Sequence, residues 1–219
     1  DADPSAGTTN LNGSGVSHGT LTAGLVGATG DNGVGVASVN WKTKILPLQA
    51  LSDSGSGWTD DVTAAVNYAV TQGVDVINMS MGTSGSDPIL EQAIDNAVDA
   101  GVTVVAAAGN SGSSSYAYQG CSYQGEGLYP AVLPNVIAVG ATDSSNNRSD
   151  FSSYGSPVDV MAPGQGSIKS TMWTKNNQTS AYSSSLAGTS FASPIVAGVV
   201  ALKIGQEPAI TPAEVRSEL

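Results

Sequence analysis

The 219-residue sequence contains a single cysteine, Cys121, and a single histidine, His18. One cysteine cannot form an intrachain disulfide, so a small domain held together by disulfides is excluded. Basic residues are also scarce, because 7 Lys and Arg stand against 18 Asp and Glu, giving a formal net charge of −11. Such a surface repels the phosphate backbone, so we expect no nucleic-acid partner. No apolar run is long enough to span a bilayer, so we expect no membrane partner.

Short apolar runs alternate with segments of helical periodicity. Strands are predicted at 44–51, 74–81, 102–109, 136–142 and 158–164, and helices at 60–72 and 88–101. A last helix is predicted to begin at Thr211, with Pro212 in its first position and Glu214 completing a capping box, and to continue to the end of the chain. This alternation predicts a three-layer α/β/α fold with a mainly parallel sheet, in one domain over residues 1–219.

Three residues are candidates for catalysis, and each has an ordinary structural explanation as well. His18, in "SHGTLTAG", would be a half-exposed histidine near a helix start. Asn110, in "AAAGNSG", would belong to a turn, and Ser190, in "GTSFASP", would be a helix N-cap. Together, however, they supply a base, an amide donor and a serine at a helix start, where N–H groups and the helix dipole stabilise an oxyanion. The combination favours nucleophilic catalysis.

These three segments resemble the His, Asn and Ser blocks of the subtilisin-like serine peptidases (subtilases), in the order of that family. The intervening "VINMSMG", "YPAVLPNVIAVGATDSSNNRSDFSSYG" and "DVMAPG" resemble the same family, so the resemblance covers nearly the whole chain from Ser17 onward. It implies a secreted, monomeric serine endopeptidase that hydrolyses peptide bonds through an acyl-enzyme intermediate. Ser190 would be the nucleophile, His18 the general base and acid, and Asn110 an oxyanion donor beside the Ser190 N–H.

The resemblance also implies where a peptide or protein substrate binds. Its backbone would lie as an added strand between two stretches of the chain. Small residues would line the primary specificity pocket and leave room for a bulky apolar or aromatic side chain before the cleaved bond, while Trp58 and Met81 would border a more distant subsite. The residues implied in substrate binding are Gly55, Ser56, Gly57, Met81, Gly82, Ala107, Ala108 and Gly109.

The catalytic aspartate of the family has no counterpart in this sequence. In the family it ends a first strand well upstream of the histidine, whereas Asp1 and Asp3 lie in a Gly, Ser and Thr-rich stretch without a preceding strand. Neither is assigned the role. The sequence is interpreted as incomplete at both ends, without the aspartate, a propeptide and a signal. We therefore expect this chain alone to have little activity.

Two other functions stay open at this point. A catalytically impaired subtilase-like domain would bind peptides or act as a scaffold, and the missing aspartate favours it. A nucleotide-binding protein would use "GATGDNGVG", but this stretch lacks phosphate-loop spacing and a following lysine. The resemblance implies no cofactor for catalysis. Asp31 and Asn32, in the same stretch, are weak candidate ligands of a structural Ca²⁺.

Overall fold

The computed structural model describes residues 18–52, 54–112, 128–173, 180–183 and 185–219. Its centre is a four-stranded sheet with the strand order β1-β2-β3-β4, in which every neighbouring pair is parallel. The strands are Val76–Met79 (β1), Thr103–Ala107 (β2), Val136–Thr142 (β3) and Val160–Pro163 (β4). All four fall inside segments predicted as strands.

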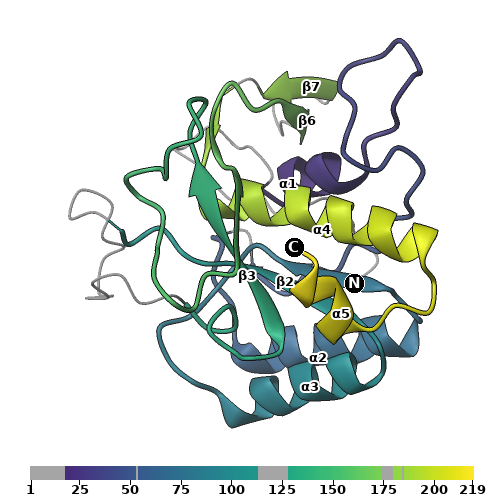
Figure 1. The fold of residues 1–219 in the computed structure, drawn as a ribbon, viewed down its shortest axis with the longest axis vertical. Coiled ribbons are helices and arrows are strands. Elements are labelled where there is room, and N and C mark those ends of the chain that lie inside the picture. Colours follow the sequence, from purple (N-terminus) through teal and green to yellow (C-terminus); the bar gives the residue numbers. More distant parts are fainter. Residues whose placement is uncertain (1–17, 53, 113–127, 174–179, 184) are drawn as a thin grey trace.

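Helices cover both faces of this sheet (Figure 1). One face carries α2 (Thr59–Thr71) and α3 (Pro88–Asp99), close to the two helices predicted there. On the other face lie α4 (Thr189–Gln206) and α5 (Pro212–Ser217), and α1 (His18–Gly27) packs against α4. The predicted three-layer α/β/α arrangement is therefore confirmed. Two small antiparallel pairs complete the described elements: Gln165–Gly166 (β5) with Leu186–Ala187 (β8), and Ser170–Trp173 (β6) with Ser180–Ser183 (β7).

The apolar strands are explained by burial on both faces of the sheet. Successive side chains of a strand point to opposite faces. In β2, Val104 and Ala106 pack with residues of α2 and α3, whereas Val105 packs with residues of α4. In β3, Ile137 and Val139 join the same cluster as Val105. A strand buried on both sides needs apolar residues throughout, which is why these runs could be recognised in the sequence.

Local capping residues determine where several helices begin. Asp87 precedes α3, and its carboxylate accepts hydrogen bonds from the N–H groups of Ile89 and Leu90 at 3.0 and 3.3 Å. The predicted capping box between Thr211 and Glu214 is present at the start of α5. The prediction that this helix continues to the end of the chain is wrong, because α5 ends at Ser217.

The predicted strand at 44–51 is also wrong. The segment is irregular, and its apolar side chains Ile45, Leu46 and Leu48 are 37–41% exposed. An apolar run becomes a strand only when a neighbouring strand supplies hydrogen-bond partners. Within the described residues, no strand pairs with this segment. None of the described helices has the length and apolar character that crossing a membrane requires.

Candidate active site

The first turn of α4 is hydrogen-bonded to residues that follow three different strands of the sheet. The donor–acceptor pairs are Gly188 N to Gly164 O (2.8 Å), Thr189 N to Asn110 Oδ1 (2.9 Å) and Ser80 Oγ to Ser190 O (2.8 Å). Ser80 follows β1, Asn110 follows β2, and Gly164 follows β4. The carboxyl ends of parallel strands are where ligands bind in sheets of this kind. The start of α4 is thus fixed at the edge where a site is expected.

Gly188 is the N-cap of α4, and Ser190 is the second residue of the helix. The alternative interpretation of Ser190 as the N-cap is therefore wrong. Gly188 has φ and ψ both at +148°, a conformation that only glycine adopts without strain. This backbone turn allows the chain to leave β8 and enter α4 directly. It leaves the serine one residue inside the helix, in the first turn.

Ser190 offers a backbone donor that has no partner in the part of the chain the structure describes. The N–H groups of a first helical turn have no acceptors within the helix and need partners elsewhere. Gly188 N and Thr189 N have the partners given above, and Phe191 N donates to Gly188 O at 3.0 Å. Among the described residues, no acceptor is found for Ser190 N. This N–H is therefore available to bind a ligand oxygen at the positive end of the helix dipole.

Asn110 supplies a second donor, its side-chain amide nitrogen. Its Oδ1 accepts hydrogen bonds from Thr189 N at 2.9 Å and from Thr189 Oγ1 at 3.1 Å. Because a backbone N–H can only donate, the amide atom that faces it must be the oxygen. Nδ2 then points the other way, 3.8 Å from where a Cβ on Gly188 would lie, and no described residue accepts from it. Asn110 Nδ2 and Ser190 N–H thus lie at the same helix start, both without a partner among the described residues.

His18 is the first residue of α1 and is half-buried. Its ring lies 5.5 Å, centroid to centroid, from the ring of Phe191, which directly follows Ser190. Burial lowers the pKa of His18 below its usual value of 6.5, so the imidazole is neutral at pH 7 and able to accept a proton. Within the described residues, no carboxylate is hydrogen-bonded to His18; Asp1 and Asp3 lie outside them.

The helix that carries His18 is attached to β6. Two hydroxyl groups of β6 donate to carbonyl groups of α1, Ser170 Oγ to Leu21 O at 2.6 Å and Thr171 Oγ1 to Thr20 O at 2.9 Å. Gly24 faces the same hydroxyls, and a Cβ there would collide with both. The close approach fixes the position of α1, which also packs against α4. The structure therefore brings the predicted base, serine and amide to one end of α4.

The loop residues predicted to flank the substrate lie in the turn before α2 and at the end of β1. Around Gly55, the chain makes a compact turn in which Ser52 N and Ser52 Oγ donate to Ser56 O at 2.9 and 2.6 Å. Ser56 and Gly57 are exposed, and Trp58 is 80% exposed. Met81 and Gly82 follow Ser80 at the end of β1.

Leu128 contacts both of the other stretches predicted to bind substrate, residues 81–82 and residues 107–109. Sequence reasoning missed this residue. A Cβ on Gly82 or on Gly109 would lie 2.9 Å from a side-chain atom of Leu128, and Leu128 N donates to Ala108 O at 3.3 Å. Ala107 and Ala108 are 4% and 1% exposed at the end of β2. No motif singles out Leu128, because its partners come from distant parts of the chain.

The proposed calcium ligands are exposed and make no metal cluster. Asn32 Oδ1 accepts a hydrogen bond from Val34 N at 3.0 Å. In the part of the chain that the structure describes, no group of three or more His, Cys, Asp or Glu side chains surrounds a possible metal position. A Ca²⁺ at Asp31 and Asn32 stays a prediction. Cys121 lies outside the described residues.

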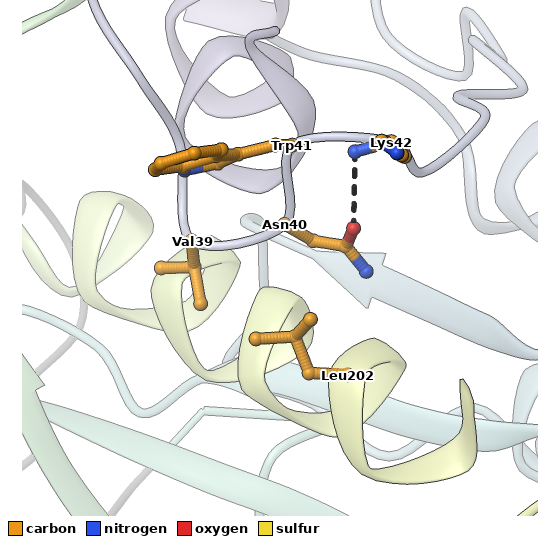
Figure 2. A pocket seen from close by; sticks show the side chains of 5 residues that line it. All are labelled: Val39, Asn40, Trp41, Lys42 and Leu202. Atoms are coloured by element: carbon orange, nitrogen blue, oxygen red, sulfur yellow. Dashed lines mark hydrogen bonds between the residues drawn. The ribbon is translucent and has the colours of Figure 1, made fainter. Parts of the chain in front are cut away.

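A shallow surface hollow of about 390 Å³ lies elsewhere on the molecule (Figure 2). Figure 2 shows the residues that line it, Val39, Asn40, Trp41 and Lys42 from one loop and Leu202 from α4. Leu202 lies 12 residues beyond Ser190, which corresponds to about 18 Å along the helix axis. None of the predicted catalytic residues lines this hollow, so it is not the candidate active site.

Comparison with known proteins finds one family throughout. The model of the subtilase family matches residues 1–219. The chain is 43% identical over 210 residues to subtilisin DY of Bacillus licheniformis, covering 96% of this chain and 70% of that protein. It is 42% identical over 205 residues to subtilisin amylosacchariticus of Bacillus subtilis, covering 94% of this chain and 50% of that protein.

A solved structure of a protease from Pseudoalteromonas arctica is similar with a TM-score of 0.79 and 35% identity, covering 91% of this chain and 62% of that one. The chain thus spans 50–70% of the length of these matched proteins.

Proposed function

The chain belongs to the subtilase family, and we propose that residues 1–219 belong to one catalytic domain of a serine endopeptidase that cleaves proteins. The observation that carries the proposal is a pair of donors at the helix start beside the Ser190 side chain, Ser190 N–H and Asn110 Nδ2, for which no described residue is an acceptor. Two such donors stabilise the oxyanion that forms when a serine attacks a peptide carbonyl.

In the first half of the proposed reaction, Ser190 Oγ attacks the carbonyl carbon of the scissile peptide bond while His18 takes the hydroxyl proton. The carbonyl oxygen becomes an oxyanion and accepts from Ser190 N–H and Asn110 Nδ2. The C–N bond then breaks, and His18 gives its proton to the leaving amine. The acyl group remains on Ser190 as an ester.

In the second half, a water molecule attacks the ester carbonyl and His18 takes one of its protons. The same two donors hold the second oxyanion. The C–O bond to Ser190 breaks, His18 returns the proton to Ser190 Oγ, and the carboxylic acid product leaves. The lowered pKa of His18 supports this role, because the neutral imidazole must accept a proton twice in each cycle.

We also propose the finer properties that the family resemblance implies. The substrate backbone would lie along Gly55, Ser56 and Gly57 on one side and along Met81 and Gly82 on the other, with a preference for apolar or aromatic residues before the cleaved bond. The protein would be secreted and monomeric, with a propeptide in its precursor. A structural Ca²⁺ at Asp31 and Asn32 rests on that resemblance alone.

Covalent labelling with a fluorophosphonate tests the proposed function. Such reagents phosphonylate a serine only where a base and an oxyanion site activate it. We expect the folded 219-residue chain to be labelled at one residue, slowly, and Ser190→Ala to abolish labelling. Ser86→Ala, which removes an exposed serine just before α3, should leave the rate unchanged.

Labelling that persists in Ser190→Ala would contradict the assignment of the nucleophile. A folded chain that binds peptides but is not labelled at all would instead support the impaired, peptide-binding domain. If wild type is labelled and Ser190→Ala is not, the impaired, peptide-binding domain is excluded.

A further inference from the structure

Pro194 deprives one carbonyl of α4 of its usual hydrogen bond. In an α-helix, the carbonyl of each residue accepts from the N–H four residues later. For Ser190 that residue is Pro194, which lies inside α4, is fully buried and has no N–H. The carbonyl of Ser190 therefore needs a donor from outside the helix.

Ser80, at the end of β1, supplies that donor. Its hydroxyl donates to Ser190 O at 2.8 Å. The same hydroxyl oxygen accepts from Asn78 Nδ2 at 3.0 Å, so its proton is directed at Ser190 O. Asn78 Oδ1 in turn accepts from Ser193 Oγ at 2.7 Å, and Ser193 is fully buried one turn further along α4. The chain of hydrogen bonds thus leaves α4 at Ser193 and returns to it at Ser190.

We propose that Asn78 and Ser80 are positioning residues for Ser190. By holding the carbonyl that Pro194 leaves free, they fix the peptide plane and the rotation of the first turn of α4. This fixes the direction of the Ser190 N–H and hydroxyl relative to Asn110. The inference rests on the proposed function, because the orientation of these groups matters most when they bind a reacting carbonyl.

Replacement of Ser80 tests the direct bond. A peptidyl phosphonate that labels Ser190 with saturation kinetics separates the maximal rate, kinact, from the binding constant, KI. In Ser80→Ala we expect kinact to fall about tenfold with KI changed less than twofold. Ser80→Thr keeps the hydroxyl and should restore kinact to within about twofold of wild type. Thr71→Ala removes a similar hydroxyl-to-carbonyl bond, Thr71 Oγ1 to Asn67 O in α2, and should change neither constant.

A double-mutant cycle with Pro194→Ala tests the reason for the bond. The introduced alanine has an N–H that can donate to Ser190 O within the helix, so Ser80 is no longer needed there. We expect Ser80→Ala to slow kinact about tenfold in wild type but less than about twofold in the Pro194→Ala background. Equal effects of Ser80→Ala in both backgrounds would overturn the proposed role of Pro194.

Asn78→Asp tests the second link without removing a side chain. A carboxylate can accept from Ser193 but cannot donate to Ser80, so the Ser80 hydroxyl turns toward the carboxylate and away from Ser190 O. The expected fall in kinact matches that of Ser80→Ala. Unchanged kinact in folded Ser80→Ala and Asn78→Asp would overturn the positioning role.

Hydrogen exchange separates this inference from the proposed function. The amides at 191–193 should exchange faster in Ser80→Ala and regain protection when Pro194→Ala is added. If wild type is not labelled at all, the proposed function fails, and these exchange rates still decide whether Ser80 holds the turn. Identical exchange in wild type and Ser80→Ala would refute the contact itself.

Discussion

Asn110 uses the two halves of one amide group for different purposes. Its oxygen is held by Thr189, and this contact turns the nitrogen toward the space above Gly188. An amide whose orientation is already fixed loses little entropy when it binds an oxyanion, which is the condition for effective electrostatic stabilisation. The proposed catalytic bond therefore depends on the structural one.

Replacing Asn110 should separate these two uses. We expect Asn110→Ala to lower kinact for the peptidyl phosphonate about 10²–10³-fold, a magnitude that comes from the corresponding change in subtilisin itself. Asn110→Asp keeps an oxygen for Thr189 but has no N–H to donate, so its loss should be at least as large. The assay is single-turnover labelling, with folding checked by circular dichroism. An aspartate variant that retains wild-type kinact would show that Asn110 acts only through Thr189.

At this scale the sequence predicted part of the site. His18, Asn110 and Ser190 lie in recognisable segments, and the rule that strand ends meet at one edge predicts that they come together. Asn78 and Ser80 lie in "VINMSMG", but nothing local indicates that Ser80 donates to a carbonyl 110 residues away. Such contacts depend on tertiary packing, so the sequence alone does not reveal them.

At the scale of elements, Asp87 connects the starts of two helices. The hydroxyl of Thr59, at the start of α2, and the N–H groups of Leu90 and Ile89 in α3 lower the pKa of the Asp87 carboxyl below its usual 3.8. A carboxyl with a lowered pKa in the folded state stabilises the fold above its unfolded pKa. This stabilisation is lost as the pH falls through the folded value.

Asp87→Asn should remove this pH dependence while keeping a side chain that caps helices well. Between pH 6 and pH 3 we expect the urea midpoint of unfolding to fall more in wild type than in Asp87→Asn. Only wild type has the hydrogen-bonded carboxylate of Asp87, whose protonation at low pH removes its stabilising effect. Urea unfolding followed by circular dichroism at several pH values gives the comparison. Parallel pH dependence in the two proteins would contradict a stabilising role for the charged form.

Elements were predictable where local sequence and tertiary partners agree. The strand at Val136–Thr142 and the cap at Thr211 follow from patterns within a few residues. The segment at 44–51 has an equally apolar pattern but no strand beside it among the described residues. A strand depends on its neighbour as much as on its own residues, so pattern alone fails there.

At the scale of the whole molecule, the net charge of −11 should affect how fast charged substrates arrive. Long-range attraction acts over about 30 Å at 0.01 M salt but only about 8 Å at 0.15 M. A cationic substrate is therefore attracted at low salt by the summed field of the protein, even when no acidic residue touches it. A neutral substrate experiences no such attraction.

Two fluorophosphonate probes with the same reactive group, one carrying a lysine-rich linker and one a neutral linker, test this effect. We expect the second-order labelling rate of the cationic probe to fall about two- to tenfold between 0.01 and 0.15 M NaCl, while that of the neutral probe stays constant. The ratio of the two rates removes any effect of salt on the reactive serine itself. A ratio that stays constant with salt would show that the acidic residues lie too far from the path to Ser190 to influence encounter.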